Sequence, residues 1–113
     1  MQVQLIRRKK NLIARFRGEL DHHTSEIFRK TVDKELAKND QVQNLILNMA
    51  NLTFMDSSGI GAILGRYKQV KARGGRVIIC GLKTHNKKIL EIGGLLKIIP
   101  VCSDESKAIA SLD

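Results

Sequence analysis

The chain has 113 residues, 42% of them hydrophobic, with one proline and no tryptophan. This length suits one domain with a core of its own and excludes the two-lobed architectures of most cofactor enzymes. The formal charge is +9, from 20 basic and 11 acidic residues. Such a charge is compatible with a nucleic acid, an anionic membrane surface or an acidic protein as a partner, and it does not choose among them.

Several classes of protein are disfavoured by what the sequence lacks. No run of apolar residues approaches the length of about 18 that a membrane span requires. The opening residues alternate between apolar and polar types, which differs from the pattern of a secretion signal. We therefore expect a cytoplasmic protein that binds no membrane. Three phenylalanines and one tyrosine offer little surface for stacking bases, so we expect no direct nucleic acid contact. Cys80 and Cys102 have no metal-like spacing with the histidines, which predicts buried, reduced thiols and no metal or cofactor.

The first part of the chain predicts a hairpin, a helix and a buried strand. Apolar residues alternate between positions 3 and 16 and are interrupted by polar residues at 8–11, as in an antiparallel hairpin. A helix follows, capped by Asp21 or Thr24 and ended by Asn39 and Asp40. Residues 44–49 are typical of a buried strand. The inner face of the helix is expected to carry Ile27, Phe28, Thr31, Val32 and Leu36.

The second part predicts three helices that alternate with two strands. Apolar residues at helical spacing indicate a helix over 58–72, which Gly74 and Gly75 end before a strand over 76–81. A short helix is expected over 84–92 and a strand over 97–101. Pro100 lacks an amide donor, which places that strand at a sheet edge or next to a bulge. Ser103 is expected to cap a last helix whose inner residues are Ala108, Ile109 and Leu112.

The resulting order of elements is ββαβαβαβα. Strands that alternate with helices form right-handed crossovers and parallel pairs, whereas the opening hairpin is antiparallel. The sequence therefore predicts a single α/β domain over residues 1–113. Its sheet should be mixed and mainly parallel, with about five strands and about four helices.

A polar turn at residues 54–61, Phe-Met-Asp-Ser-Ser-Gly-Ile-Gly, is the best candidate for function. It joins a predicted strand to a predicted helix. The first amides of a helix lack internal partners and the dipole is positive there, so an exposed hydroxyl can accept a phosphate without electrostatic penalty. The simpler interpretation of the same residues is that Asp56 or Ser57 caps the helix.

The residues at this turn fit two kinds of enzyme site poorly. The glycines at 59, 61 and 65 suggest a dinucleotide-binding turn, but no acidic residue ends the next predicted strand to hold a ribose, and close helix packing explains the small residues better. A serine hydrolase would need a base such as His22 or His23 beside Ser57 or Ser58. The G-x-S-x-G elbow is absent, so we expect no enzyme.

The motifs as a set resemble the anti-sigma factor antagonists of the STAS superfamily, above all the members that act in sporulation. The resemblance rests on residues 18–24 (Gly-Glu-Leu-Asp-His-His-Thr), 51–61, 64–69 (Leu-Gly-Arg-Tyr-Lys-Gln) and 95–99 (Leu-Leu-Lys-Ile-Ile). The order Asp-Ser-Ser-Gly in the second of these is a specific marker. The family fold, a small mixed sheet with alternating helices, agrees with the predicted order.

The resemblance implies a regulatory switch. In that family the serine directly after the aspartate is phosphorylated by the anti-sigma factor, which is an ATP-dependent serine kinase. The unmodified antagonist binds the anti-sigma factor and frees the sigma factor, and a serine phosphatase restores the modified form. The acceptor here would be Ser57. The expected partner-binding residues are Asp21, His22, His23, Thr24, Asp56, Ser58, Gly59, Ile60 and Gly61.

One feature departs from the family, and one rival function stays open. The positive charge is not a family trait and leaves the electrostatics of partner binding unexplained. The rival is a nucleotide- or anion-binding module that uses the helix start at residues 56–59, Asp-Ser-Ser-Gly.

Overall fold

A computed structural model describes all residues, Met1–Asp113. One sheet has the strand order β1-β2-β3-β4-β5. β1 pairs antiparallel with β2, and every other pair is parallel. The predicted α/β class and order of elements are confirmed. The strands are β1 (Gln2–Arg8), β2 (Asn11–Leu20), β3 (Asn44–Met55), β4 (Val77–Cys80) and β5 (Val101–Cys102), and the helices are α1 (His22–Lys38), α2 (Ser58–Ala72), α3 (Thr84–Ile92), the 3-10 turn η1 (Leu95–Lys97) and α4 (Glu105–Leu112).

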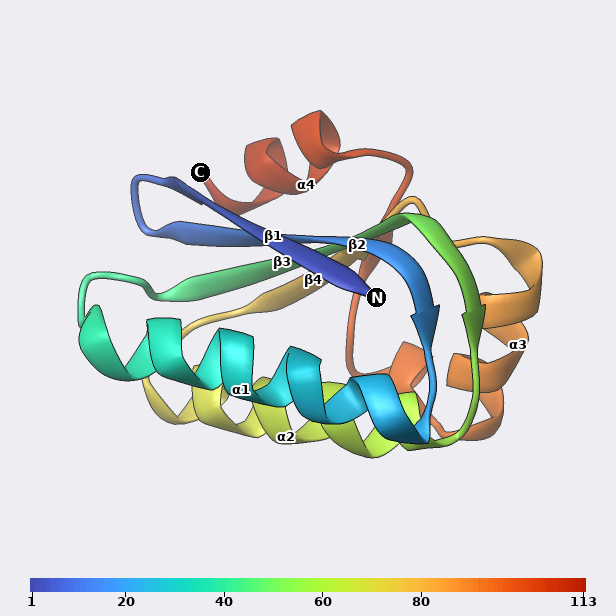
Figure 1. Ribbon diagram of the computed structural model, residues 1–113. Helices are drawn as coiled ribbons and strands as arrows, with labels where there is room; N and C mark the ends of the chain where they lie inside the picture. Colours follow the sequence, from blue (N-terminus) through green and yellow to red (C-terminus); the bar gives the residue numbers. More distant parts are fainter.

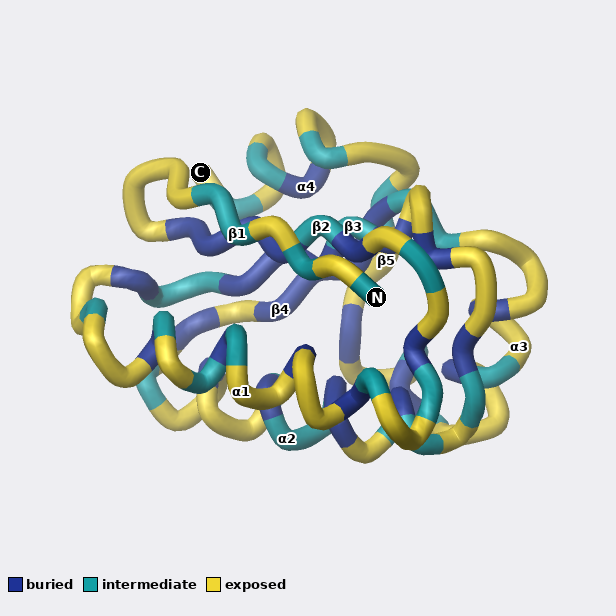
Figure 2. The backbone as a smooth tube through the Cα atoms, viewed as in Figure 1, coloured by how far each residue is buried: buried dark blue, intermediate teal, exposed yellow.

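The sheet separates two layers of helices. Figure 1 shows α1 and α2 side by side on one face, α4 on the other and α3 at one end. The larger part of the core fills the space between the sheet and the α1–α2 layer, where Phe16 and Phe28 meet with their ring centroids 5.0 Å apart. A smaller cluster under α4 includes Ile13, Ile46 and Ala108. The buried positions run along the strands and the inner helix faces (Figure 2).

The inner face of α1 is narrower than the sequence predicted. Ser25, Phe28, Val32 and Leu36 are buried, which follows the three- and four-residue spacing of one helix face. Ile27 was expected on that face and is instead 42% exposed. It lies about 100° around the helix from Phe28, beyond the stripe that faces the sheet.

The junction of α1 and α2 contains a buried arginine. Arg66 is only 8% exposed, and its Nε lies 2.9 Å from Asp33 Oδ1, although the two groups are not aligned for a hydrogen bond. Gln69 Nε2 donates to the same oxygen at 2.9 Å. Burial lowers the pKa of Arg66, and the nearby Arg29 adds to that effect. The two helices are thus held together by charge as well as by apolar contact.

The predicted strand over 97–101 is wrong. The chain forms the 3-10 turn η1 there, after Gly94 in the left-handed region with φ 77°, and β5 is only two residues long. Pro100 has no amide to donate, so the chain enters the sheet only beyond it, with the Pro100 carbonyl accepting from Ile79 N at 3.0 Å. β5 lies at the sheet edge, as the proline predicted.

Two element boundaries also differ from the predictions. β3 continues to Met55 instead of ending near residue 49, because it pairs with the long β2 across two register shifts. Asp104, not Ser103, caps α4, and its side chain accepts from Lys107 N at 2.9 Å. Both residue types cap helices well, so only the backbone decides between them.

The two turns that the sequence predicted, after β1 and after α2, are confirmed. The hairpin turns at Lys9 and Lys10, and Gly74 adopts φ 79° after α2. Both cysteines are free, and Cys80 is buried as expected. Cys102 was also expected to be buried and is only half-buried, because it lies on the edge strand β5. No helix combines the length and the apolar character that crossing a membrane requires.

Candidate functional site

The parallel pairing of β2 and β3 brings two loops together at one edge of the sheet. Leu20 and Met55 are register partners and are the last residues of their strands. Asp56 N donates to Leu20 O at 3.2 Å, so the loop after β3 is bonded to the end of β2. The two sequence motifs at residues 18–24 and 54–61 therefore form one site, as the topology of a parallel sheet requires.

The first loop is organised by a capping box. Thr24 N donates to Asp21 Oδ1 at 2.9 Å, and Asp21 N donates to Thr24 Oγ1 at 2.9 Å. The Thr24 hydroxyl donates in turn to Glu19 O at 2.8 Å. Hydrogen bonds from Thr24, chiefly from its backbone amide, hold the pKa of Asp21 below its ordinary value. Asp21 is thus a helix cap whose half-buried carboxylate stays ionised at neutral pH.

The second loop uses its aspartate for the helix start and leaves Ser57 free. Asp56 Oδ1 accepts from Ser58 N at 2.8 Å. Ser57 is exposed, and its side chain makes no capping hydrogen bond. Ser58 is half-buried and is the first residue of α2. The serine after the aspartate therefore presents a hydroxyl at a helix N-terminus with no structural task of its own.

The small residues after the serines do two different things. A Cβ on buried Gly59 would lie 2.7 Å from Met55 Sδ and 3.0 Å from Leu20 Cδ2, so glycine lets α2 start against both strand ends. A Cβ on Gly61 or Gly65 would meet nothing within 4 Å. The prediction that these glycines serve close packing is right for Gly59 and wrong for the other two. Ile60 is half-buried against the main core.

An open groove of about 450 Å³ lies between the starts of α1 and α2, and no hydrophobic residue lines it. The sequence predicted four of the lining residues as site residues besides Ser57 and missed the rest. The missed residues lie three, four and seven positions after His22, which is the helical spacing of one face and the signal that could have found them. The groove is lined by His22, His23, Ser25, Glu26, Arg29, Ser57, Ser58 and Gly61.

Arg29 changes the electrostatics that the sequence suggested. No arginine is near Ser57 in the sequence, yet α1 brings this one to the same groove. Arg29 takes part in none of the ion pairs of the molecule. Glu26, its neighbour in the groove, pairs with Lys30 at 3.9 Å. The groove thus contains a cation that forms no ion pair, together with the Glu26 carboxylate and two serine hydroxyls. No cluster of side chains in the molecule is suited to a metal ion.

The fold and this site define the class of protein. The STAS domain family matches residues 2–108, and the chain belongs to that family. An anti-sigma F factor antagonist from Paenibacillus polymyxa is 38% identical over 113 residues, which cover 100% of this chain and 96% of the relative. These findings confirm the resemblance to anti-sigma factor antagonists. The relatives carry the names of regulators and not of enzymes.

Solved structures agree with this assignment. The unphosphorylated form of the anti-sigma factor antagonist SpoIIAA superposes with a TM-score of 0.86 and 32% identity, covering 97% of this chain and 95% of that one. The phosphorylated form of the Bacillus cell fate determinant SpoIIAA superposes with a TM-score of 0.78 and 31% identity, covering 99% and 100%.

Proposed function

We propose that this chain is a phosphorylation-controlled anti-sigma factor antagonist of sporulation transcription, acting in the cytoplasm. The unmodified form binds an anti-sigma factor, a serine kinase that carries ATP or ADP, and so frees the sigma factor. Phosphorylation of Ser57 switches the antagonist off, and a serine phosphatase restores it. The observation that carries this proposal is the exposed Ser57 hydroxyl, free of any cap, on a polar groove next to the Asp21 loop.

The partner surface consists of the two joined loops and the start of α2. Asp21 offers an ionised carboxylate that can pair with a basic residue of the kinase, and His22 and His23 are exposed beside it. Ser58, Gly61 and exposed parts of α2 complete the surface. Asp56 and Thr24 act by fixing the backbone, because their side chains bond within the loops. Gly59 and Ile60 position α2 from below.

The switch follows from charge. A phosphate adds roughly −1.5 to −2 charges at neutral pH, and Ser57 is flanked by the Asp56 carboxylate. A partner surface that docks a neutral hydroxyl there would have to bury the added charge, which costs several kcal/mol when it is unpaired. Each ~1.4 kcal/mol is a factor of ten in affinity. One added phosphate is therefore enough to abolish a complex of moderate affinity.

The switch does not require a change of fold. Ile60 and Leu64 pack against the main core, so moving α2 would expose apolar surface. The chain superposes on solved SpoIIAA structures of both forms, unphosphorylated and phosphorylated, which supports a switch that operates within one fold. We expect the two forms of this chain to superpose closely outside residues 55–60.

The test is to measure the intact mass of this chain after incubation with ATP and an anti-sigma F factor, the partner that the name of the Paenibacillus polymyxa relative indicates. We expect one added phosphate, which fragmentation places on Ser57. Ser57→Ala should take up none, whereas Ser58→Ala should be modified as the parent is. Phosphate on Ser58, or none at all, would contradict the assignment.

The alternative is a nucleotide- or anion-binding module that uses the same groove, which the free Arg29 and the polar lining favour. A thermal-shift titration with ATP and GTP in the absence of a kinase separates the two functions. Only a direct binder gains stability that rises with the logarithm of the ligand concentration once this exceeds the dissociation constant.

A further inference from the structure

A second polar cavity lies at the end of the sheet opposite Ser57. Figure 1 shows the turn of the β1–β2 hairpin at one end of the molecule and the starts of α1 and α2 at the other. The cavity, called the basic cavity here, has a volume of about 610 Å³. Four cationic side chains and one carboxylate line it, with no aromatic residue. Its lining is Arg7, Lys9, Lys10, Asp40, Gln41, Val42, Gln43 and Arg73.

The turn that supplies two of these cations has an unfavourable sequence for its shape. Arg8 and Asn11 are register partners, so Lys9 and Lys10 form a two-residue loop. Lys9 has φ 56° and is the only non-glycine residue with positive φ. Two-residue hairpins strongly favour Gly, Asn or Asp at such a position, because a β-carbon there is strained. Lysine at position 9 therefore adds a positive charge to the cavity but makes the turn less stable than glycine, asparagine or aspartate would.

The walls of the cavity are held in place by hydrogen bonds. Lys10 O accepts from Gln43 N at 2.9 Å and from Asn44 N at 3.1 Å, which ties the hairpin to the loop before β3. Arg73 donates to Leu36 O at 2.9 Å and to Val42 O at 2.8 Å. These bonds fix the shape of the cavity before any ligand arrives, which lowers the entropy cost of binding.

The charges in the cavity are not neutralised within the molecule. Arg7 donates through Nη2 to Gln41 Oε1 at 2.7 Å and through Nε to Lys9 O at 3.2 Å, so its partners are neutral. The ion pairs of the molecule do not include Arg7, Lys9, Lys10 or Asp40. The cavity therefore carries an excess of positive charge that an anionic ligand would neutralise.

We propose that the basic cavity binds an acidic peptide segment of a protein partner, independently of the state of Ser57. Guanidinium and ammonium groups pair with carboxylates, and the amides of Gln41 and Gln43 can bond a peptide backbone. A nucleic acid fits less well, because the cavity offers no aromatic side chain on which a base could stack.

The test is fluorescence anisotropy of fluorescein-labelled octaglutamate with the full chain, compared with the double variant Lys9→Gly/Lys10→Ser. Gly-Ser suits a two-residue hairpin turn, so this variant should melt at the same temperature or higher. It should nevertheless bind the peptide about tenfold more weakly, since two ion pairs are lost. Binding of the parent should fall as salt rises.

The matched control is Lys87→Gln/Lys88→Gln, which removes the same charge from exposed positions on α3. This control should retain the affinity for octaglutamate within about twofold. An equal loss in both variants would show that the total charge and not the cavity binds the peptide. No binding to the parent chain, or tighter binding of labelled oligothymidylate than of octaglutamate, would also overturn the proposal. None of these results depends on whether Ser57 is phosphorylated.

Discussion

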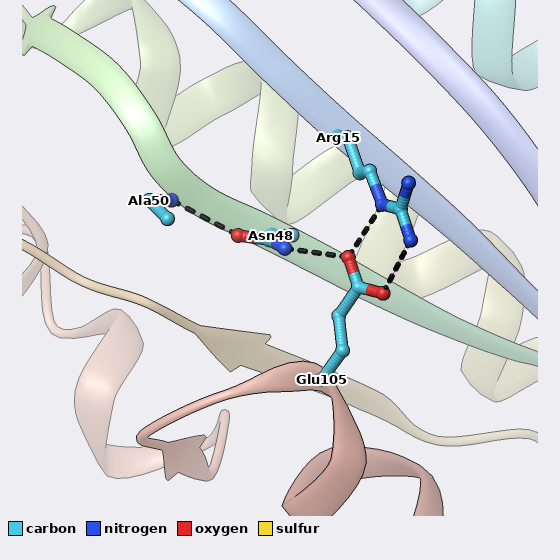
Figure 3. A network of polar contacts seen from close by, with 4 residues as sticks. All are labelled: Arg15, Asn48, Ala50 and Glu105. Atoms are coloured by element: carbon cyan, nitrogen blue, oxygen red, sulfur yellow. Dashed lines mark hydrogen bonds and ion pairs between the residues drawn. The ribbon is translucent and has the colours of Figure 1, made fainter.

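Arg15 of β2 and Glu105 in the first turn of α4 form a two-pronged ion pair, Nε to Oε2 at 2.7 Å and Nη2 to Oε1 at 2.8 Å (Figure 3). Asn48 of β3 donates to the same carboxylate at 2.5 Å and accepts from Ala50 N at 3.0 Å. The Glu105 side chain thus links the last helix to the neighbouring strands β2 and β3. The bond from Arg15 lowers the pKa of Glu105, and the same pair raises the pKa of Arg15.

This pair predicts a pH dependence of stability. Because the pKa of Glu105 is lower in the folded than in the unfolded chain, its contribution is complete above the unfolded value and is lost as pH falls through the folded one. Glu105→Gln should lower the free energy of unfolding at pH 7 by about 1 kcal/mol and flatten its fall below about pH 4.5. Urea denaturation at several pH values measures both effects.

The control for this prediction is Glu91→Gln, an exposed carboxylate on α3 that has no ion pair. It should leave stability unchanged within about 0.5 kcal/mol. If Glu105→Gln and the parent chain lost stability in parallel as pH falls, the pair would not contribute in the way that its geometry indicates.

Gly59→Ala should destabilise the protein, whereas Gly61→Ala should not. The new Cβ at 59 would collide with Met55 and Leu20, which are buried and cannot move freely. We expect a loss of roughly 1–3 kcal/mol from such overpacking. At 61 the Cβ enters open space, so the better helix propensity of alanine should leave stability equal or higher. Thermal unfolding of the two variants would refute this account if their order were reversed.

Cys80 should resist alkylation in the folded protein. Burial raises the pKa of the Cys80 thiol to about 11, so only about a thousandth is thiolate at pH 8. Cys102 is half-buried and should react first with iodoacetamide. Mass spectrometry should find one label in buffer and two in urea, and Cys102→Ser should stay unlabelled until it unfolds. Rapid labelling of Cys80 in the native chain would show that the region under α4 opens readily.

Asp21→Asn should weaken partner binding more than it lowers the melting temperature. Asparagine keeps an oxygen that can accept from Thr24 N, so the cap survives while the charge is lost. Thr24→Val is the matched control, because it keeps the charge and removes the hydroxyl that bonds to Asp21 N and Glu19 O. It should cost about 1 kcal/mol of stability. Unchanged affinity of Asp21→Asn for the anti-sigma factor would exclude a role for this charge in recognition.

The layers of the fold could be predicted from sequence because their signals are local. Alternation in the hairpin and helical spacing in α2 each follow from a single periodic face, and the parallel crossovers follow from the order of elements. The prediction of a strand over 97–101 was wrong because a short apolar run does not distinguish a strand from a turn, and Pro100 prevented pairing. Ile27 was misplaced because the sequence does not reveal how wide a stripe the sheet covers.

The site could be predicted only in part, because sequence patterns reveal local features and not which distant residues pack together. The Asp-Ser-Ser-Gly turn is local, and the parallel topology placed it next to residues 21–24. Arg29 is remote from Ser57 in the sequence and reaches the groove through the packing of α1 beside α2, so only its helical spacing from His22 could have indicated it. The basic cavity similarly joins three loops that are separate in the sequence.

The affinity of the anti-sigma factor for three forms of this chain tests the central claim most directly. Isothermal titration should compare the unmodified protein, the Ser57→Ala variant and protein fully phosphorylated at Ser57 by mass. The unmodified and alanine forms should bind within about threefold of each other, because neither adds charge to the groove. The phosphorylated form should bind at least about a hundredfold more weakly, since the partner would have to bury roughly −1.5 to −2 added charges beside the Asp56 carboxylate. Equal affinity of the phosphorylated and unmodified forms would contradict the account.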